Sequence, residues 1–214
     1  LQLIERMSEY NCPLWICAID FRKAFDTVEH SAIWASLTEQ GVHHRYISLL
    51  RRLYSAQTGQ IVLQAESKHF RITRGTKQGD PLSPSLFNAV LEKALGAAQV
   101  EWRRKKYGIS VDGGELERLC NLRFADDIVL LASSKAELKQ MIEDLVRASS
   151  EVGLDVHTGK TKVLTNTGIT GYVEVKGSKI EIVETTEYLG RKLTFQHAHK
   201  VEIESRIAKG WKKF

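Results

Sequence analysis

Blocks of apolar and polar residues predict both helices and short strands along this chain. The longest uninterrupted apolar run covers residues 14–19 and stops at Asp20. Such a run predicts a strand buried on both faces. Two further apolar arms, residues 122–124 and 128–132, flank Ala125-Asp126-Asp127. They predict two strands joined by a tight turn.

Helical periodicity and turn residues supply the remaining elements. Helices are predicted at 29–40, 44–55, 83–106 and 135–152, and from about 197 onward. Strands are predicted at 61–63 paired with 70–72, and at 162–164, 173–175, 180–183 and 188–193, with a hairpin turn at 112–114. Asp26 and Glu29 fit a helix capping box. The order predicts an α+β fold, with helices on one face of a small antiparallel sheet.

Composition sets wide bounds on function. The chain has 214 residues, of which 43% are hydrophobic, enough for one domain with a core. Its net charge of +5 is compatible with a polyanionic partner but is shared by many ordinary domains.

Cysteine usage and apolar content predict an intracellular protein. Cys12, Cys17 and Cys120 form no Cys-x-x-Cys pair and no cluster with zinc spacing, which favours reduced thiols. The six-residue apolar run is too short to span a membrane, and no signal peptide is visible, so we expect neither a membrane partner nor secretion. The chain begins at Leu1 and stops at Phe214 within a helical pattern, so we expect a longer parent polyprotein.

Three aspartates are candidate metal ligands. Adjacent Asp126 and Asp127 alone would suit an ordinary turn. Asp20 also ends a buried strand, so three carboxylates would converge at one sheet edge if the strands are neighbours. Carboxylate oxygens are ligands that Mg²⁺ prefers, and two ions roughly 3.5–4 Å apart support phosphoryl transfer. The three aspartates together therefore favour a metal site over a simple turn.

Five motifs in order carry a family resemblance. Residues 18–26 (AIDFRKAFD), 75–84 (GTKQGDPLSP) and 124–127 (FADD) resemble motifs A, B and C of reverse transcriptases. Gly153-Leu154 with residues 160–162 resembles motif D, and Tyr188-Leu189-Gly190 resembles motif E. The set spans residues 15–190 and is most similar to the enzymes of non-LTR (LINE-type) retrotransposons. Retroviral enzymes usually carry Tyr-Met-Asp-Asp at motif C, and group II intron enzymes Tyr-Ala-Asp-Asp.

The resemblance implies an RNA-directed DNA polymerase that adds dNTPs to a primer 3′-hydroxyl by two-metal nucleotidyl transfer. It implies two Mg²⁺ ions, with Mn²⁺ as a substitute. Their ligands would be Asp20, Asp126 and Asp127, all three catalytic, with the main-chain carbonyl of Phe21. Lys160 would protonate the leaving pyrophosphate as a general acid, and Lys162 competes for this role.

The resemblance also assigns substrate contacts. Phe25 would exclude the ribose 2′-hydroxyl as a steric gate. Gln78 and Gly79 would bind the incoming nucleotide and the template. Tyr188, Leu189 and Gly190 would form the primer grip.

The implied architecture is a right-hand polymerase palm with part of the fingers and the first thumb helix. We expect the palm with partial fingers at 1–195, including a fingers-side insertion at about 42–75, and the start of a truncated thumb helix at 196–214. The implied partners are an RNA template, a DNA primer, dNTPs and the rest of the polyprotein, in a nuclear or cytoplasmic ribonucleoprotein. Because the upstream fingers motifs are missing, we expect the isolated chain to be a poor polymerase.

Two other functions remain open from the sequence. One is a non-catalytic or domesticated retroelement remnant that only binds nucleic acid. The other is an RNA-dependent RNA polymerase palm, against which Phe25 and the Gln78-Gly79 loop argue.

Overall fold

The computed structural model describes residues 2–63, 67–77, 79–111 and 118–211. The chain divides into two compact units. The strand-rich unit comprises Leu1–Phe21, Ala98–Arg147 and Val156–Phe214, and the helical unit comprises Arg22–Ala97 and Ala148–Asp155.

A six-stranded sheet organises the strand-rich unit, in the order β6-β7-β1-β8-β10-β9. Its strands are β1 (Trp15–Ile19), β6 (Asn121–Phe124), β7 (Asp127–Ala132), β8 (Lys162–Thr165), β9 (Gly171–Val175) and β10 (Ser178–Ile182). The central strand β1 pairs antiparallel with both β7 and β8. β10 lies parallel to β8, so the sheet is mixed. The prediction of an antiparallel sheet was therefore wrong. The parallel pair arises because the β9–β10 hairpin sets its second strand, rather than its first, against β8.

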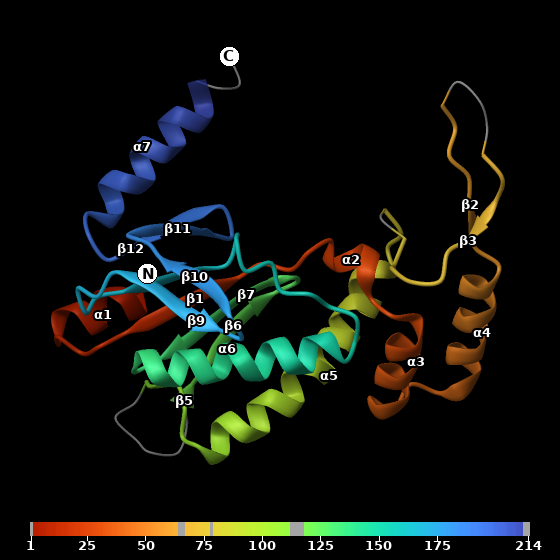
Figure 1. The fold of residues 1–214 in the computed structure, drawn as a ribbon, viewed down its shortest axis with the longest axis horizontal. Helices are drawn as coiled ribbons and strands as arrows, with labels where there is room; N and C mark the ends of the chain where they lie inside the picture. Colours follow the sequence, from red (N-terminus) through yellow and green to blue (C-terminus); the bar gives the residue numbers. More distant parts are fainter. Residues whose placement is uncertain (1, 64–66, 78, 112–117, 212–214) are drawn as a thin grey trace. The chain divides into compact units, whose positions relative to one another are not determined.

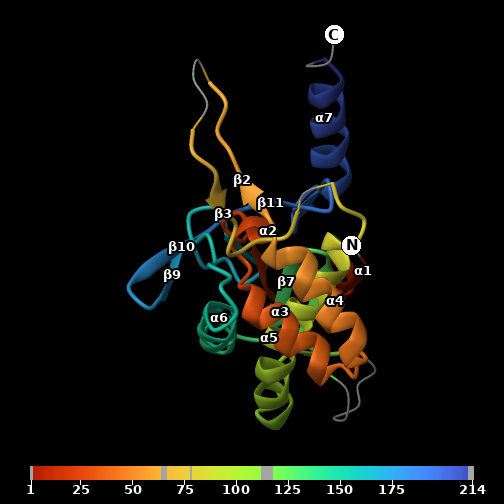
Figure 2. The ribbon, with the colours of Figure 1, turned by 90° about the vertical axis from the view of Figure 1, so that its right-hand side faces the viewer.

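Both faces of this sheet are covered. Alternate residues Ile16, Val129 and Leu131 share one face and pack with Ile4 of α1 (Gln2–Glu9). Helix α6 (Lys135–Ser150) runs along the other face (Figures 1 and 2). The prediction of helices on one face alone was therefore wrong, because the short helix α1 gave no sequence signal for the face on which it packs.

Helix α5 (Ser83–Arg104) contributes its C-terminal turns to the strand-rich unit. There the buried Trp102 donates its indole N–H to Asp144 of α6 at 3.3 Å. β4 (Ile109–Ser110) and β5 (Arg118–Leu119) form a small antiparallel pair. The turn predicted at 112–114 lies outside the described residues.

The helical unit contains α2 (Ala24–Thr27), α3 (His30–Glu39) and α4 (His44–Ser55), which confirms the two longer helices predicted there. The predicted capping box was wrong. Asp26 lies inside α2, and the N-cap of α3 is Glu29, whose side chain makes no cap hydrogen bond. The extended conformation of Val28 separates the two helices, so Asp26 precedes the break rather than capping α3.

The strand pair of this unit is shifted from its predicted position. β2 (Thr58–Gly59) pairs with β3 (Phe70–Arg71), and residues 61–63 form no named strand. A Cβ on Gly59 would lie 2.8 Å from the Phe70 ring, so the missing side chain gives that ring its room. The packing of the Phe70 ring on Gly59 therefore decided the position of the strand pair, rather than the apolar run at 61–63.

The C-terminal part of the strand-rich unit is a hairpin followed by a helix. β11 (Thr185–Tyr188) and β12 (Arg191–Thr194) replace the single strand predicted at 188–193, and α7 spans Ala198–Trp211. Leu189 and Gly190 have φ values of +51° and +74°, as a two-residue hairpin turn of this type requires. This turn divides the strand predicted at 188–193 and lies within the predicted primer grip.

Two further sequence expectations concern cysteines and membranes. Cys12, Cys17 and Cys120 are free thiols, and Cys17 is fully buried in β1. Within the described ranges, no helix has the length and apolar content needed to cross a membrane.

Candidate active site

The turn between β6 and β7 positions two of the three predicted aspartates. Phe124 pairs with Asp127, leaving Ala125 and Asp126 as the turn. Ala125 has a φ of +52°, a left-handed conformation that costs a residue with a side chain about 1–2 kcal/mol. The pairing of the two strands holds this strained turn, with Asp126 in the turn itself and Asp127 at the start of β7.

Asp20 reaches the same sheet edge through β1. The register pairs Ile19 with Ile128, and one further step along it sets Asp20 opposite Asp127. The Asp20 N–H donates to Thr161 Oγ1 at 3.2 Å, and its carbonyl accepts from the His157 N–H at 2.7 Å. These bonds fasten the backbone of Asp20 to the segment that leads into β8.

The three carboxylates form an acidic triad, by which we mean Asp20, Asp126 and Asp127. The Asp20 Oδ2 atom is buried and has no hydrogen-bond partner among the described residues. The pKa of Asp127 is raised, first by partial removal of its carboxylate from water and then by the negative charges of Asp126 and Asp20. A buried carboxylate oxygen without a hydrogen bond, together with mutual repulsion, is what a bound cation would relieve.

The donor set of the acidic triad fits a hard divalent cation, since it offers only carboxylate oxygens. Across the described ranges, no three His, Cys, Asp or Glu side chains are already gathered around a common metal position. The triad therefore has the chemistry of a magnesium site, and its side chains would have to turn inward to chelate an ion.

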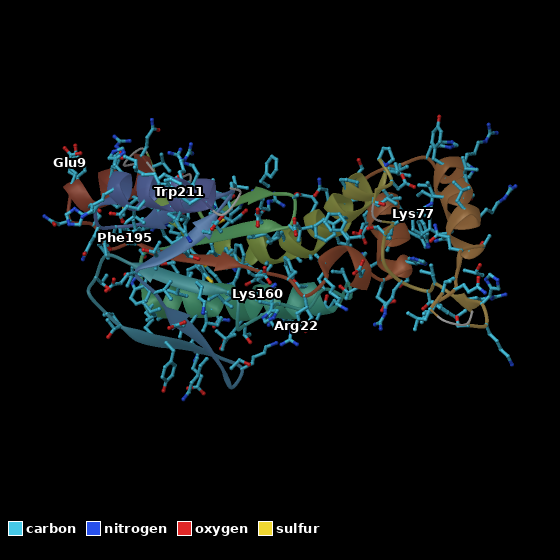
Figure 3. All side chains as sticks on the ribbon, turned by 90° about the horizontal axis from the view of Figure 1, so that it is seen from above. Glu9, Arg22, Lys77, Lys160, Phe195 and Trp211 are labelled. Atoms are coloured by element: carbon cyan, nitrogen blue, oxygen red, sulfur yellow. The ribbon has the colours of Figure 1, made fainter. Side chains whose placement is uncertain are left out.

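Lys160, which is labelled in Figure 3, lies beside the triad. Its Nζ is 3.9 Å from Asp20 Oδ2. Its competitor Lys162 instead forms an ion pair of 2.8 Å with Glu181 across β8 and β10. The two lysines predicted as alternatives thus occupy different electrostatic environments, and Lys160 is the one next to the carboxylates.

Tyr188, at the end of β11, also lies near the triad. The pKa of its phenol is raised, mainly by partial burial and then by the charge of Asp127. Leu189 and Gly190 follow as the hairpin turn, and the Leu189 side chain is half exposed. The predicted primer-grip residues therefore form a hairpin tip whose first residue faces Asp127.

Phe25 and the predicted nucleotide loop lie in the helical unit. The Phe25 carbonyl accepts from the Thr76 N–H at 2.6 Å, and its ring lies 4.6 Å, centroid to centroid, from that of the buried Phe87. Gly79 has a φ of +88°, and a Cβ there would meet no atom within 4 Å. Gln78 lies outside the described residues.

Tight backbone contacts tie this loop to the segment that follows Phe25. Gly75 has a φ of +86°, and a Cβ on it would lie 2.7 Å from the Asp26 carbonyl oxygen. His30 Nε2 lies 2.9 Å from the Gly75 carbonyl, and the Ser83 hydroxyl donates to the Lys77 carbonyl at 2.6 Å. Residues 25–26 and 75–76 are thus in direct backbone contact within this unit.

The sequence interpretation overlooked His157 and Thr161. Thr161 is fully buried, and both residues hold the backbone of Asp20. The signal was present: Thr161 is a small polar residue between Lys160 and Lys162, the two charged candidates for the general acid.

Removing one negative charge from the triad should stabilise the metal-free protein. The pKa of Asp127 is higher in the folded state than in the unfolded state. The contribution of this group to folding stability is therefore fully present below the unfolded-state pKa, and it is lost as the pH rises through the folded-state pKa. At neutral pH the carboxylate therefore opposes folding. We expect Asp127→Asn to raise the free energy of unfolding by less than about 1 kcal/mol, since the group is largely exposed.

Urea unfolding in EDTA at neutral and acidic pH measures this effect. The gain in the free energy of unfolding should shrink as the pH falls, because Asp127 of the unchanged chain then becomes protonated and loses its charge. Asp155→Asn is the control, since Asp155 pairs with Arg22 at 3.2 Å and has a favourable partner to lose. A lower stability of Asp127→Asn at neutral pH would contradict the assigned repulsion.

Comparison with known proteins identifies the family. Residues 4–193 match the model described as "Reverse transcriptase (RNA-dependent DNA polymerase)". A Pol polyprotein of the type-1 retrotransposable element R2 from Popillia japonica is 33% identical over 159 residues, covering 73% of this chain and 21% of the relative. The corresponding protein of the type-2 element R2DM from Drosophila melanogaster is 30% identical over 170 residues, covering 78% and 15%. The chain thus spans about a fifth or less of these relatives.

A solved structure shows the same fold at low identity. Apo telomerase from Candida tropicalis, truncated from its C-terminal domain, aligns with a TM-score of 0.61 and 13% identity, covering 92% of this chain and 39% of that one. The fold is thus α+β with a mixed six-stranded sheet, similar to telomerase. With the family match over residues 4–193, the chain belongs to the reverse transcriptase family and is related to the proteins of the non-LTR retrotransposons R2, R1 and TX1.

Proposed function

We propose that this chain is the catalytic part of an RNA-directed DNA polymerase, which adds dNTPs to a primer 3′-hydroxyl on an RNA template. The observation that carries the proposal is the acidic triad: β1 and β7 bring Asp20 beside Asp127, and Asp126 adds a third carboxylate. Membership of the reverse transcriptase family supports the same reaction.

The triad would hold Mg²⁺, or Mn²⁺ in its place, through the side chains of Asp20, Asp126 and Asp127 with the main-chain carbonyl of Phe21. When bound, two such cations supply Lewis-acid activation of the attacking hydroxyl and neutralise charge on the phosphate. The protein's own part is to present the carboxylates. Asp20 is held by its backbone bonds to Thr161 and His157, and Asp126 by the β6–β7 turn.

The remaining site residues would handle the substrates. Phe25 would exclude the ribose 2′-hydroxyl, with Phe87 packed against its ring. Gln78 and Gly79 would contact the nucleotide and the template, since the open side of Gly79 permits close approach of a ligand. Tyr188, Leu189 and Gly190 would position the primer as a hairpin tip.

The architectural assignments belong to the same proposal. Residues 1–195 would be the palm with partial fingers, of which about 42–75 form the fingers-side insertion, and 196–214 would begin the thumb. The working enzyme would be a larger polyprotein assembled with RNA in the nucleus or cytoplasm.

Primer extension by the full-length protein tests the function. The assay compares RNA and DNA templates and supplies dNTPs or NTPs, with Mg²⁺ or EDTA. Extension with dNTPs on RNA that requires Mg²⁺ is the expected result. Incorporation of NTPs alone would favour an RNA polymerase, and nucleic-acid binding without extension would favour a non-catalytic remnant.

Lys160 would protonate the leaving pyrophosphate. We expect Lys160→Ala to slow single-nucleotide addition by about 100-fold, the lower end for loss of a general acid, and to flatten the alkaline limb of the pH–rate profile. Lys162→Ala is the matched control, because it removes the same charge from a lysine that is paired with Glu181. Equal losses in the two variants would remove Lys160 from the mechanism.

A further inference from the structure

Positive charge is concentrated in one part of the helical unit. The basic segment, residues 42–77, contains seven of the 31 Lys and Arg residues but one of the 26 Asp and Glu residues. Its net charge is +6, whereas the rest of the chain sums to −1. The overall basicity of the protein therefore arises from these 36 residues, which follow motif A and end within motif B.

Among the residues that the structure describes, the cations of the basic segment have no side-chain partners. Its seven basic side chains are exposed, and none forms an ion pair or hydrogen bond to a side chain within the described ranges: Arg45, Arg51, Arg52, Lys68, Arg71, Arg74 and Lys77. Elsewhere in the described chain, several lysines are paired with carboxylates, as Lys93 is with Glu39 and Lys209 with Glu187, each at 2.7–2.8 Å. Seven unneutralised cations on one short segment leave it suited to an external polyanion.

Exposed aromatic and aliphatic side chains lie among these cations. On α4, Ile47 and Tyr54 are buried, whereas Tyr46 is 66% exposed and lies next to Arg45 in the sequence. On β3, Phe70 is 48% exposed and directly precedes Arg71. Figure 2 shows the hairpin that contains β2 and β3 extending away from α4.

Aromatic faces next to unpaired arginines fit single-stranded nucleic acid. Bases that are free of a duplex stack on aromatic rings, while arginines bind the phosphates between them. A duplex would use the cations but not the rings, and an acidic membrane surface would need no stacking platform.

We propose that the basic segment is a binding surface for single-stranded RNA, distinct from the acidic triad. Arg45, Arg52 and Arg71 engage the phosphates, and Tyr46 and Phe70 stack with bases. The binding requires neither divalent cations nor catalysis, so it stands whether or not the polymerase assignment holds.

Fluorescence anisotropy with the full chain tests this surface. The probe is an unstructured RNA of about 16 nucleotides, the upper end of a single-strand site, in EDTA without primer or dNTPs. Arg45→Gln/Arg52→Gln/Arg71→Gln should weaken binding roughly tenfold or more and reduce the slope of log K against log salt by about 2. Tyr46→Leu/Phe70→Leu should weaken binding to the single strand more than to duplex RNA.

A matched triple variant removes the same charge elsewhere. Lys93→Gln/Arg104→Gln/Lys139→Gln alters cations that already have carboxylate partners, so its effect on affinity should be small. Circular dichroism and thermal unfolding establish that each variant is folded. Equal losses in the two triple variants, an aromatic pair with no effect, or tighter binding to phosphatidylserine vesicles than to RNA would each overturn the proposal.

Discussion

Replacing Asp126 with asparagine is expected to abolish primer extension by the full-length protein. The amide keeps the shape of the side chain but removes a negative charge from the triad, which then holds a divalent cation less well. Loss of a group that stabilises transition-state charge costs at least about 100-fold in rate. Single-nucleotide addition on an RNA template, measured over a range of Mg²⁺ concentrations, gives the size of the loss.

Two controls separate this loss from misfolding. Asp155→Asn makes the same chemical change at an aspartate that is paired with Arg22, and it should leave the rate unchanged. The melting temperature of Asp126→Asn in EDTA should not fall, because the substitution removes a charge that raises the pKa of Asp127. Mg²⁺ should raise the melting temperature of the unchanged protein more than that of the variant. Full activity of Asp126→Asn would exclude the triad as the catalytic centre.

Replacing Phe25 with valine is expected to admit ribonucleotides. The Phe25 backbone is fixed by Thr76, and its ring is packed against Phe87, so the ring cannot easily move aside for a 2′-hydroxyl. A shorter side chain removes that obstruction while keeping an apolar surface. We expect the preference for dNTPs over NTPs to fall by at least about tenfold, the lower end of what one steric contact contributes in an enzyme pocket.

The measurement is the ratio of kcat/KM for a dNTP and its matching NTP. The rate with dNTPs should change much less than the rate with NTPs, because the chemistry of the triad is untouched. Tyr172→Val, which alters a half-exposed aromatic residue on β9, should leave the ratio unchanged. Full retention of selectivity in Phe25→Val would exclude Phe25 as the steric gate.

Local patterns in the sequence predicted local structure well. The helices α3 and α4, the strands around Asp126 and the hydrophobic strand before Asp20 all follow from residue periodicity and turn residues. The errors arose where longer-range packing outweighed those patterns. Phe70 set the position of the β2–β3 pair by lying across Gly59, and the insertion of β10 beside β8 made the sheet mixed.

The resemblance of the five ordered motifs to those of reverse transcriptases indicated the chemistry, nucleotidyl transfer at a carboxylate site. The motifs could not show which lysine neighbours the carboxylates, or that Thr161 and His157 fasten Asp20. Only the tertiary structure shows that the cations of the basic segment have no side-chain partners within the described part of the chain. A sequence sets residue types and local conformation, whereas strand pairing between distant segments decides which charges meet, and hence which are repelled, paired or left free.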